Sequence, residues 1–440
     1  MKLPEKAPQI TISPERLVEI TNSNEIANIV FDINENYYYW DKVKYLPLPN
    51  NILTSEEAWY IAHLRRKINS RRIGFGKYQF RWFSNNNMQE LLHHFDMGIG
   101  ASLESKSLIP DEHKQSYLIN SLMEESIASS QIEGAVTTRK IAKEMLRKKR
   151  NPHTKSEKMI YNNYLTITEI IKIKNEKLTV ELLLHIHKLV SKDTLDNKEE
   201  EGALRKTNDV RVVDIEQSEA VYIPPAHDEL LVLLNDLCTF FNDEHTQFFI
   251  HPIVKASIIH FMIGFIHPFA DGNGRTARAL FYWYLLKRGY WLTEYLSISS
   301  VINKSKAQYA RAFLYTETDE NDLGYFISYQ LRTMQLAYNG LKEYLNRKIA
   351  EKKRATSFVM MDNINERQAL ILQWIYEDDS LILTNRELMS RFNISKETAR
   401  NDLAGLVTLE WLRQFGLNNK TQAYTKSERF DELIEDNYKK

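Results

Sequence analysis

One run of twelve residues decides the fold of this 440-residue chain: His267-Pro268-Phe269-Ala270-Asp271-Gly272-Asn273-Gly274-Arg275-Thr276-Ala277-Arg278. It combines an imidazole, a carboxylate, two glycines around an asparagine, and two arginines. An apolar segment, 258–266, precedes the run, and a segment with a helical pattern, 276–287, follows it. The first turn of a helix carries unpaired backbone N–H groups that attract anions. The run therefore predicts a polyphosphate-binding loop that ends at a helix N-terminus.

The glycines and arginines of this run suit phosphate binding. Gly272 and Gly274 let the backbone approach a phosphate closely and adopt positive φ angles where needed. Arg275 and Arg278 are three residues apart, so on a helix they share one face. Two guanidinium groups on one face can bind several phosphate oxygens at once. We therefore assign these four residues to a phosphate site.

Asp271 and His267 supply the remaining chemistry of the run. A carboxylate is a hard oxygen ligand, and Mg²⁺ usually binds through one or two carboxylates together with substrate phosphates. His267 is the only residue of the run whose ordinary pKa lies near neutrality, so it suits a general base. Taken singly, each residue also has a plain structural explanation, such as a helix-ending histidine, an Asp-Gly turn or a C-cap glycine. Their combination in this order favours the functional interpretation.

The run resembles the signature of the Fic family, H-x-F-x-[D/E]-G-N-G-R-x-x-R, and matches it at every specified position. Fic proteins mostly transfer AMP from ATP to a hydroxyl side chain of a target protein. The resemblance implies that His267 deprotonates the incoming hydroxyl and that Asp271 binds Mg²⁺ between the α- and β-phosphates. It also implies that Phe269 packs into the core and fixes the loop.

The same resemblance assigns the other positions of the run to ATP. The backbone of Gly272, Asn273 and Gly274 would form an anion hole. Arg275 would hold the outer phosphates. Arg278 would hold the γ-phosphate or pair with an inhibitory glutamate.

A second segment upstream supplies a candidate for that glutamate. Residues 113–134 have a helical pattern and end in Ser129-Ser130-Gln131-Ile132-Glu133-Gly134. This end resembles the Fic inhibitory motif [S/T]-x-x-x-E-[G/N], in which Ser129 is first and Glu133 pairs with the second arginine of the signature. A Glu133–Arg278 salt bridge would occupy the guanidinium that the γ-phosphate needs and would misalign the α-phosphorus, which can cost about a hundredfold in rate. The alternative is an ordinary surface glutamate near a helix end.

A β-hairpin is predicted between these two segments. Residues 208–213 alternate and are β-branched, residues 214–219 are polar, and residues 220–223 again have a strand pattern. The family has such a hairpin, called the flap, which adds a target segment as an extra strand by β-augmentation. The resemblance places target docking on the first strand; the alternative is a plain surface hairpin. The docking residues are Val210, Arg211, Val212 and Val213.

Two further regions have a weaker resemblance. Residues 1–111 resemble the helical N-terminal region that precedes many Fic domains, and their aromatic residues indicate packing, with target or dimer contacts as an alternative. Tyr309 lies where the family often lines the adenine pocket. However, residues 316–319 depart from the usual pattern, so a tyrosine that packs between helices is the alternative.

The C-terminal part, 361–440, has the pattern of a winged helix-turn-helix. Helices are predicted at 364–377, 385–392 and 396–407, followed by strands at 411–415 and 421–424. DNA binding would place four residues at the start of the third helix and in the turn before it toward a groove, Ser395, Lys396, Thr398 and Arg400. Glu397 and Asp402 interrupt this basic face in the sequence, and such modules also dock proteins, so both partners stay open.

Composition limits the remaining choices. Formal net charge is zero, so the chain has no global basic field for nucleic acid. Cys238 is the only cysteine, which excludes an intrachain disulfide and fits a reducing compartment. No signal-peptide pattern or membrane-spanning apolar run is present, so we expect a cytoplasmic protein with no membrane partner. We expect a mainly α fold with an N-terminal region 1–111, a Fic domain 112–347, a linker 348–360 and a winged helix 361–440.

The sequence therefore predicts a protein adenylyltransferase that uses ATP and Mg²⁺, modifies a Ser, Thr or Tyr hydroxyl and is inhibited by its own Glu133. The sequence leaves open whether the protein modifies itself and whether it forms a homodimer. The first alternative is a winged-helix regulator that senses nucleotide with little turnover. The second is a Fic enzyme that removes AMP. The intact His267 favours an enzyme, because a nucleotide sensor does not need a base.

Overall fold

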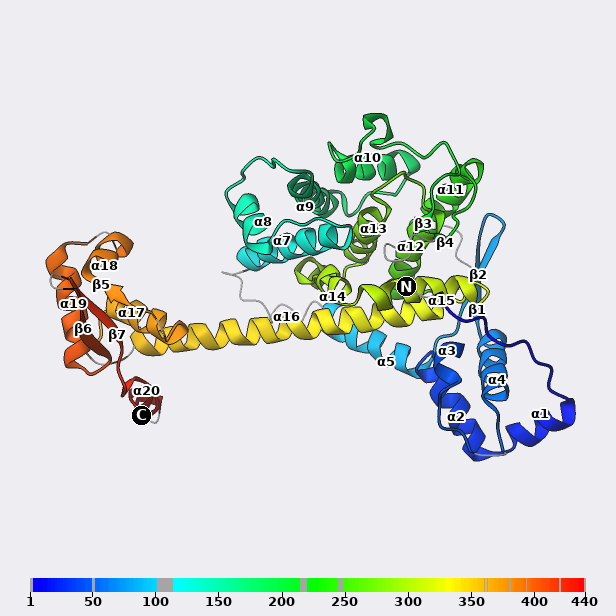
Figure 1. The fold of residues 1–440 in the computed structure, drawn as a ribbon, viewed down its shortest axis with the longest axis horizontal. Coiled ribbons are helices and arrows are strands. Elements are labelled where there is room, and N and C mark those ends of the chain that lie inside the picture. The colour runs from blue at the N-terminus through cyan, green and yellow to red at the C-terminus, as the bar shows by residue number, and fades with distance from the viewer. Residues whose placement is uncertain are drawn as a thin grey trace. The chain divides into compact units, whose positions relative to one another are not determined.

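The computed structural model describes residues 3–49, 52–100, 114–213, 220–243, 248–359, 361, 363–379, 381–392, 394–418 and 421–438. Two compact units make up the chain, Met1–Leu341 and Lys342–Lys440. Helices dominate both units, which confirms the prediction of a mainly α fold (Figure 1). Among the described residues, no helix combines the length and apolarity that crossing a bilayer requires.

The first unit begins with a helical region that also contains a β-hairpin. Its helices are α1 (Pro14–Thr21), α2 (Asn24–Glu35), α3 (Trp40–Val43), α4 (Ser55–Ile68), α5 (Asn86–Phe95) and the π-helical turn η1 (Asp96–Gly100). Strands β1 (Arg71–Phe75) and β2 (Tyr78–Trp82) pair antiparallel between α4 and α5. The sequence analysis did not predict this hairpin at 71–82. Phe75 and Phe80 are fully buried there, and Gly76 adopts φ 53° in the turn between the strands.

The rest of the first unit is a helical array around α12 (Pro252–Ile266) and α13 (Asn273–Lys287) (Figure 1). Both central helices are buried on nearly every side. The sequence of α12 is mostly apolar, as such burial requires, whereas α13 also buries the polar side chains of Asn273, Arg275 and Arg278. The surrounding helices are α7 (Lys114–Ile132), α8 (Arg139–Arg147), α9 (Lys155–Ile173), α10 (Val180–Ser191), α11 (Leu230–Phe241), α14 (Ile298–Lys304), α15 (Lys306–Thr318) and the part of α16 (Gly324–Val359) that ends at Leu341. Short 3₁₀ turns are η3 (Lys198–Glu200), η4 (His227–Glu229) and η5 (Trp291–Tyr295).

A short antiparallel hairpin interrupts this array, as predicted, but its first strand was predicted too long, because residues 208–211 of the expected strand 208–213 are not in a strand. Strand β3 (Val212–Val213) pairs with β4 (Ala220–Tyr222), with a register irregularity between the two residues of β3. The predicted turn, 214–219, lies outside the described residues.

The second unit has winged-helix topology, which confirms that prediction. It contains α17 (Glu366–Glu377), β5 (Leu383–Thr384), α18 (Asn385–Phe392), α19 (Lys396–Thr408), β6 (Leu412–Asn418), β7 (Thr421–Lys426) and α20 (Phe430–Tyr438). The strands form an antiparallel sheet in the order β5-β7-β6. Leu372, Leu388, Leu403 and Trp411 are among the residues of its own core. The predicted linker, 348–360, is helical as far as Val359, because α16 continues through it.

Candidate active site

His267 is the residue that ends α12. Its backbone is left-handed, with φ 48° and ψ 58°, an uncommon conformation for a residue other than glycine. The Nδ1 atom of His267 lies 3.2 Å from the carbonyl oxygen of Gly264. Since a carbonyl can only accept, Nδ1 carries the proton and Nε2 keeps its lone pair. The ring is therefore in the tautomer that a general base requires.

Burial holds the pKa of His267 below the ordinary value, because the surroundings disfavour the charged imidazolium. The bond to Gly264 and the charge of Glu133 act in the opposite direction and offset part of this effect. The net direction keeps the imidazole neutral near pH 7. A neutral ring can accept a proton from an incoming hydroxyl.

The loop after His267 is fixed by side-chain bonds to its own backbone. Asn273 Oδ1 accepts from the N–H of Phe269 at 3.0 Å, and Asn273 Nδ2 donates to the carbonyl of Phe269 at 2.9 Å. Phe269 is fully buried, which agrees with its expected place in the core. Gly272 adopts φ 85°, a backbone conformation that strongly favours glycine, immediately before α13. The loop geometry is thus set before any ligand arrives.

His187 of α10 is a site residue that the sequence analysis missed. Its ring stacks on Phe269 with 3.7 Å between centroids. Nε2 donates to the carbonyl of Asp271 at 2.9 Å, while Nδ1 accepts from the N–H of Gly202 at 3.1 Å. Burial lowers the pKa of His187 to about 4, so the ring stays neutral and keeps this pair of bonds. In the sequence it is only a histidine on the apolar face of a helix, which carries no functional signal.

Arg275 and Arg278 place unpaired donors beside the N-terminus of α13. Both side chains are buried, with 0% and 1% of their surface exposed. Arg275 Nη1 donates to the carbonyl of Val190 at 3.0 Å, but its Nε and Nη2 have no hydrogen-bond partner among the described residues. Arg278 Nη1 is likewise without one there. Buried unpaired donors are costly, and an anion at the helix N-terminus would satisfy them.

Asp271 is suited to bind a cation whose other ligands come from phosphates and water. Its side chain is 56% exposed, and Oδ2 lies 3.8 Å from Arg275 Nη2. Oδ1 accepts from the N–H of Gly272 at 2.5 Å. In the described parts of the chain, no group of three or more His, Cys, Asp or Glu residues is placed to hold a metal. A single carboxylate beside a phosphate site fits Mg²⁺, which takes most of its other ligands from phosphates and water.

Glu133 and Ser129 contact Arg278 across 145 and 149 positions of sequence. Arg278 Nη2 donates to Glu133 Oε1 at 2.7 Å and to the carbonyl of Ser129 at 3.0 Å, and Nε donates to Ser129 Oγ at 2.8 Å. The Glu133 carboxylate also lies directly against the backbone of Gly274, where an added Cβ would come 2.2 Å from Oε1. The carboxylate thus covers the first turn of α13. The contact is the one that the sequence predicts; its inhibitory role stays a prediction.

The hairpin is anchored close to His267. Tyr222 of β4 donates its hydroxyl to the carbonyl of Phe265 at 3.0 Å, two residues before the candidate base. Val210 is half-buried and Arg211 is exposed, and the side chains of Val212 and Val213 lie outside the described parts. The docking role of these four residues stays a prediction.

Tyr309 lies next to Arg278. Its hydroxyl hydrogen-bonds His260 Nε2 at 2.8 Å, and His260 Nδ1 in turn contacts Gln330 Nε2 at 2.6 Å. Burial raises the pKa of Tyr309, and the charge of Arg278 partly offsets this rise. The structure brings Tyr309 to the phosphate site, and its contact with adenine stays a prediction.

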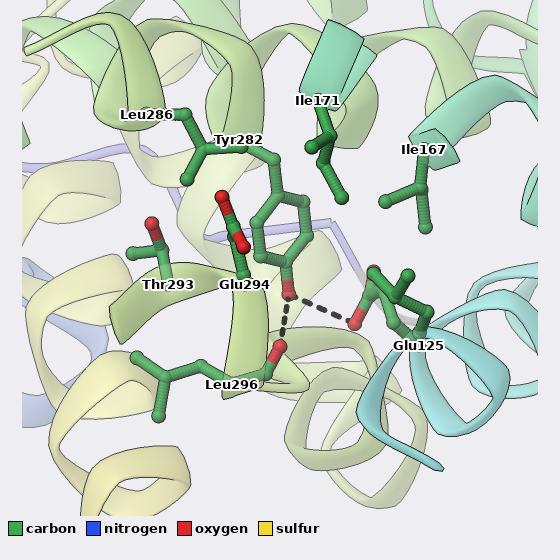
Figure 2. A pocket seen from close by; sticks show the side chains of 9 residues that line it. Glu125, Ile167, Ile171, Tyr282, Leu286, Thr293, Glu294 and Leu296 are labelled. Carbon is green, nitrogen blue, oxygen red and sulfur yellow. Dashed lines mark hydrogen bonds between the residues drawn. The ribbon is translucent and has the colours of Figure 1, made fainter. Parts of the chain in front are cut away.

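Figure 2 shows a pocket beside α7 and α13 that is lined by none of the predicted site residues. Its polar members include Glu125 of α7, which is buried and which the sequence analysis also missed. Glu125 Oε2 accepts from the Tyr282 hydroxyl at 2.9 Å, and that hydroxyl also lies 3.1 Å from the carbonyl of Leu296. Ser299 N–H donates to Glu125 at 3.0 Å. The bond to Tyr282 holds the body of α7 against α13, about one turn beyond Arg278, and the bond from Ser299 holds it against the start of α14.

Two family models match the chain. Residues 177–285 match the Fic/DOC family, and residues 367–416 match the DeoR-like helix-turn-helix domain. The resemblance to Fic proteins is confirmed for the first range, which contains His267 and the loop after it. Ser129, Glu133 and Tyr309 lie outside it.

Similar proteins are known in sequence and structure. The chain is 35% identical over 117 residues to "Protein adenylyltransferase Fic" of Culex quinquefasciatus, which covers 27% of this chain and 21% of that one. It is 39% identical over 69 residues to the protein of the same name in Drosophila melanogaster, covering 16% and 14%. The chain thus spans about a fifth or less of the length of these relatives. A crystal structure of a Fic family protein from Desulfovibrio desulfuricans G20 has 22% identity and a TM-score of 0.48, covering 78% of this chain and 95% of that one.

Proposed function

We propose that the first unit, which carries the match to the Fic/DOC family, transfers AMP from ATP to a hydroxyl group of a target protein. The DeoR-like helix-turn-helix match lies in the second unit. The proposal rests on one observation. His267, with Nδ1 bound to Gly264, lies in the loop that leads to the N-terminus of α13, where Arg275 and Arg278 keep buried donors that have no partner among the described residues. That arrangement supplies a base and an anion site together.

The chemistry follows from these positions. His267 Nε2 accepts the proton of the hydroxyl as its oxygen forms a bond to the α-phosphorus of ATP. The bond between that phosphorus and the bridging oxygen breaks, and pyrophosphate leaves. The N–H groups of the first turn of α13, with Arg275 and Arg278, stabilise the charge on the phosphates. Most of the acceleration comes from positioning and charge neutralisation, because the protein itself forms no covalent bond.

Asp271 is the residue that would hold Mg²⁺. The ion, when bound, neutralises phosphate charge and orients the departing pyrophosphate. The exposed carboxylate beside Arg275 supports this assignment. Tyr309 is proposed to contact the adenine, as the resemblance to Fic proteins implies.

The target segment is proposed to dock on the hairpin at residues 210–213. Main-chain pairing gives affinity without strict sequence demands, so Ser, Thr and Tyr hydroxyls are all suitable acceptors. The bond from Tyr222 to Phe265 supports this, because it fixes β4 near His267. A hydroxyl of the chain itself is also a proposed acceptor.

We further propose that Glu133 inhibits the transfer. Its carboxylate occupies a guanidinium donor of Arg278 and repels a phosphate at Gly274. ATP would bind with its α-phosphorus out of line, at a cost of about a hundredfold in rate.

The test uses the purified Glu133→Gly chain, Mg²⁺ and ATP labelled at either the α- or the γ-phosphate. We expect stable label on protein only from α-labelled ATP, together with release of pyrophosphate. Label from γ-labelled ATP would mean that a phosphoryl group is transferred instead. Binding of ATP with no label from either position would favour the nucleotide-sensing alternative, and release of AMP from an already modified protein would favour the removing enzyme.

We also propose that the winged-helix unit binds duplex DNA, because the structure changes one premise drawn from the sequence. Asp402 does not interrupt the basic face of α19, so that half of the prediction was wrong, whereas Glu397 is exposed on α19. Its side chain is buried and accepts from Arg367 Nε at 2.7 Å and from Asn365 Nδ2 at 2.9 Å. Lys396 and Arg400 are exposed on α19, and in the described part of this unit neither forms an ion pair. Exposed cations on this helix suit phosphate contacts.

A salt titration of binding to random duplex DNA tests this second proposal. Replacing Lys396 and Arg400 by Ala is expected to weaken binding and to reduce the salt slope by about one for each phosphate that is no longer neutralised. Arg429→Ala removes an exposed charge that already pairs with Glu432 and should have little effect. Absence of binding at low salt would favour protein docking.

A further inference from the structure

Arg205 lies behind the candidate active site and binds the backbone of the catalytic loop. Its backbone N–H donates to the carbonyl of Pro268 at 2.9 Å, and its Nε donates to the carbonyl of His267 at the same distance. The residue is buried, with 7% of its surface exposed. Two consecutive carbonyls of the loop are therefore held by one residue.

The other end of the same guanidinium holds both stems of the hairpin. Nη1 donates to the carbonyl of Thr207, before β3, at 2.9 Å. Nη2 donates to the carbonyl of Pro225, after β4. Asn208, next to Thr207, also accepts from the N–H of His227 at 2.8 Å and so joins the two stems beyond Arg205. The hairpin and the loop thus meet at one planar group.

His267 needs such support because of its backbone. A left-handed conformation is unfavourable for a residue with a Cβ and persists only when its surroundings fix it. Gly264 fixes the ring of His267 through Nδ1, and Arg205 fixes its carbonyl. Together these two bonds set where Nε2 points.

We propose that Arg205 is a positioning residue that couples the hairpin to His267. A target strand that pairs with the hairpin shifts or stiffens the stems at Thr207 and Pro225. Arg205 transmits that change to the carbonyl of His267 and so to the direction of its Nε2. This inference rests on the proposed transfer reaction, with the hairpin as the docking element.

The geometry demands an arginine. Its fork donates to three carbonyls that belong to three separate segments, and a lysine has a single ammonium that cannot reproduce that planar arrangement. A misplaced base lowers the rate without changing how nucleotide binds. We therefore expect Arg205→Lys to lower the rate of transfer by about 10- to 100-fold, with unchanged affinity for ATP.

Charge gives a second readout that a purely structural role would not move. The positive charge of Arg205 contributes to the lowered pKa of His267. Arg205→Met removes that charge, so the pKa of His267 should rise and the acid limb of the pH–rate profile should move to higher pH. Arg205→Lys keeps a charge and should slow the reaction with a smaller displacement of the limb.

The experiment compares Arg205→Lys, Arg205→Met and the control Arg150→Met, all in the Glu133→Gly chain. Arg150 binds Glu157 through a short ion pair near the start of α9. The measurements are the transfer rate against pH, ATP affinity by calorimetry, the unfolding temperature, and the titration of the His267 ring by NMR with His267→Ala to assign its signal. We expect both Arg205 variants to lose rate at unchanged ATP affinity, and only Arg205→Met to show a markedly raised His267 pKa.

Two results would overturn the inference. One is a loss of transfer rate in the Arg205 variants that is no larger than the loss in Arg150→Met for the same decrease in unfolding temperature. The other is a His267 titration in Arg205→Met identical to that of the parent chain. If the Glu133→Gly chain transfers no label at all, the proposed function fails, and the NMR titration still decides whether Arg205 controls His267.

Discussion

The loop from His267 to Arg278 and the end of α7 meet at Arg278, but they are held in opposite ways. The loop is fixed from within by Asn273 and from behind by His187, and most of it is buried. The end of α7 reaches the site through Glu133, whose side chain is 28% exposed. Gly134, which follows it, has φ 91° and open space where a Cβ would stand.

This difference separates a preorganised part from a removable one. Loss of a bond in the loop leaves a buried group unsatisfied and disturbs the base. Loss of Glu133 leaves the loop intact and frees a guanidinium. The body of α7 stays in place in either case, because Glu125 is bound to Tyr282 and Ser299.

The largest expected effect comes from a substitution in the loop, at His267. His267→Ala in the Glu133→Gly chain should lower AMP transfer by about 10²- to 10⁴-fold, because the hydroxyl loses its base. Affinity for ATP should change little, since the phosphates are held by α13 and its arginines. Rates of α-label incorporation beside calorimetric ATP binding check both parts. Full activity in His267→Ala would remove this residue from the chemistry.

Asn273→Ala tests how rigidly the loop is held. Its side chain satisfies both the N–H and the carbonyl of Phe269 inside a buried loop. Leaving such a group unpaired costs about 1–3 kcal/mol, so the free energy of unfolding should fall by that amount and transfer should slow. Denaturant unfolding measures it, with Asn339→Ala as the exposed control, expected within about 0.5 kcal/mol of the parent. Equal stabilities for the two variants would show that the loop is not fixed by this pair.

A smaller effect is expected on the α7 side. Ser129→Ala removes the bond from Arg278 Nε and should weaken the hold of α7 on this arginine. A hydrogen bond contributes about 0.5–1.5 kcal/mol, so transfer should rise by about 2- to 10-fold. The matched control is Ser130→Ala. The hydroxyl of Ser130 donates to the carbonyl of Ser126 within the same helix. Equal rates in both variants would contradict a role for Ser129 in inhibition.

The smallest expected effect is the pH dependence of the transfer rate, which tests the catalytic loop alone. Burial lowers the pKa of His267, so the neutral base persists below about pH 6.5. The transfer rate of the Glu133→Gly chain should be flat from about pH 7 to 8 and fall only below the ordinary histidine range. A rate that still climbs about tenfold between pH 7 and 8 would indicate a base other than a buried histidine.

The sequence predicts the parts of the site that have a local pattern. His267, Asp271 and the glycine-arginine run are contiguous, and the end of α7 carries its own short motif. The contact between Glu133 and Arg278 joins residues that are far apart in the sequence, and the resemblance of both motifs to the Fic family predicts it. The hairpin at 208–223 follows from alternating side chains and polar turn residues.

The residues that the sequence misses act through backbone groups or through burial. His187 and Arg205 bind carbonyls of a distant loop, and any histidine or arginine could do so if the fold placed it there. Asp402 looks like a surface charge in the sequence, but Arg367 and Asn365 draw it into the core. The β1–β2 hairpin is defined by Phe75 and Phe80 packing on α11 and α12, a contact that no local pattern specifies.

The most direct test compares initial rates of α-label incorporation by the wild-type chain and Glu133→Gly at saturating ATP and Mg²⁺. If Glu133 holds Arg278 away from the phosphates, Glu133→Gly should be faster by about a hundredfold. Equal rates in the two chains would contradict the claim that the end of α7 restrains the catalytic loop.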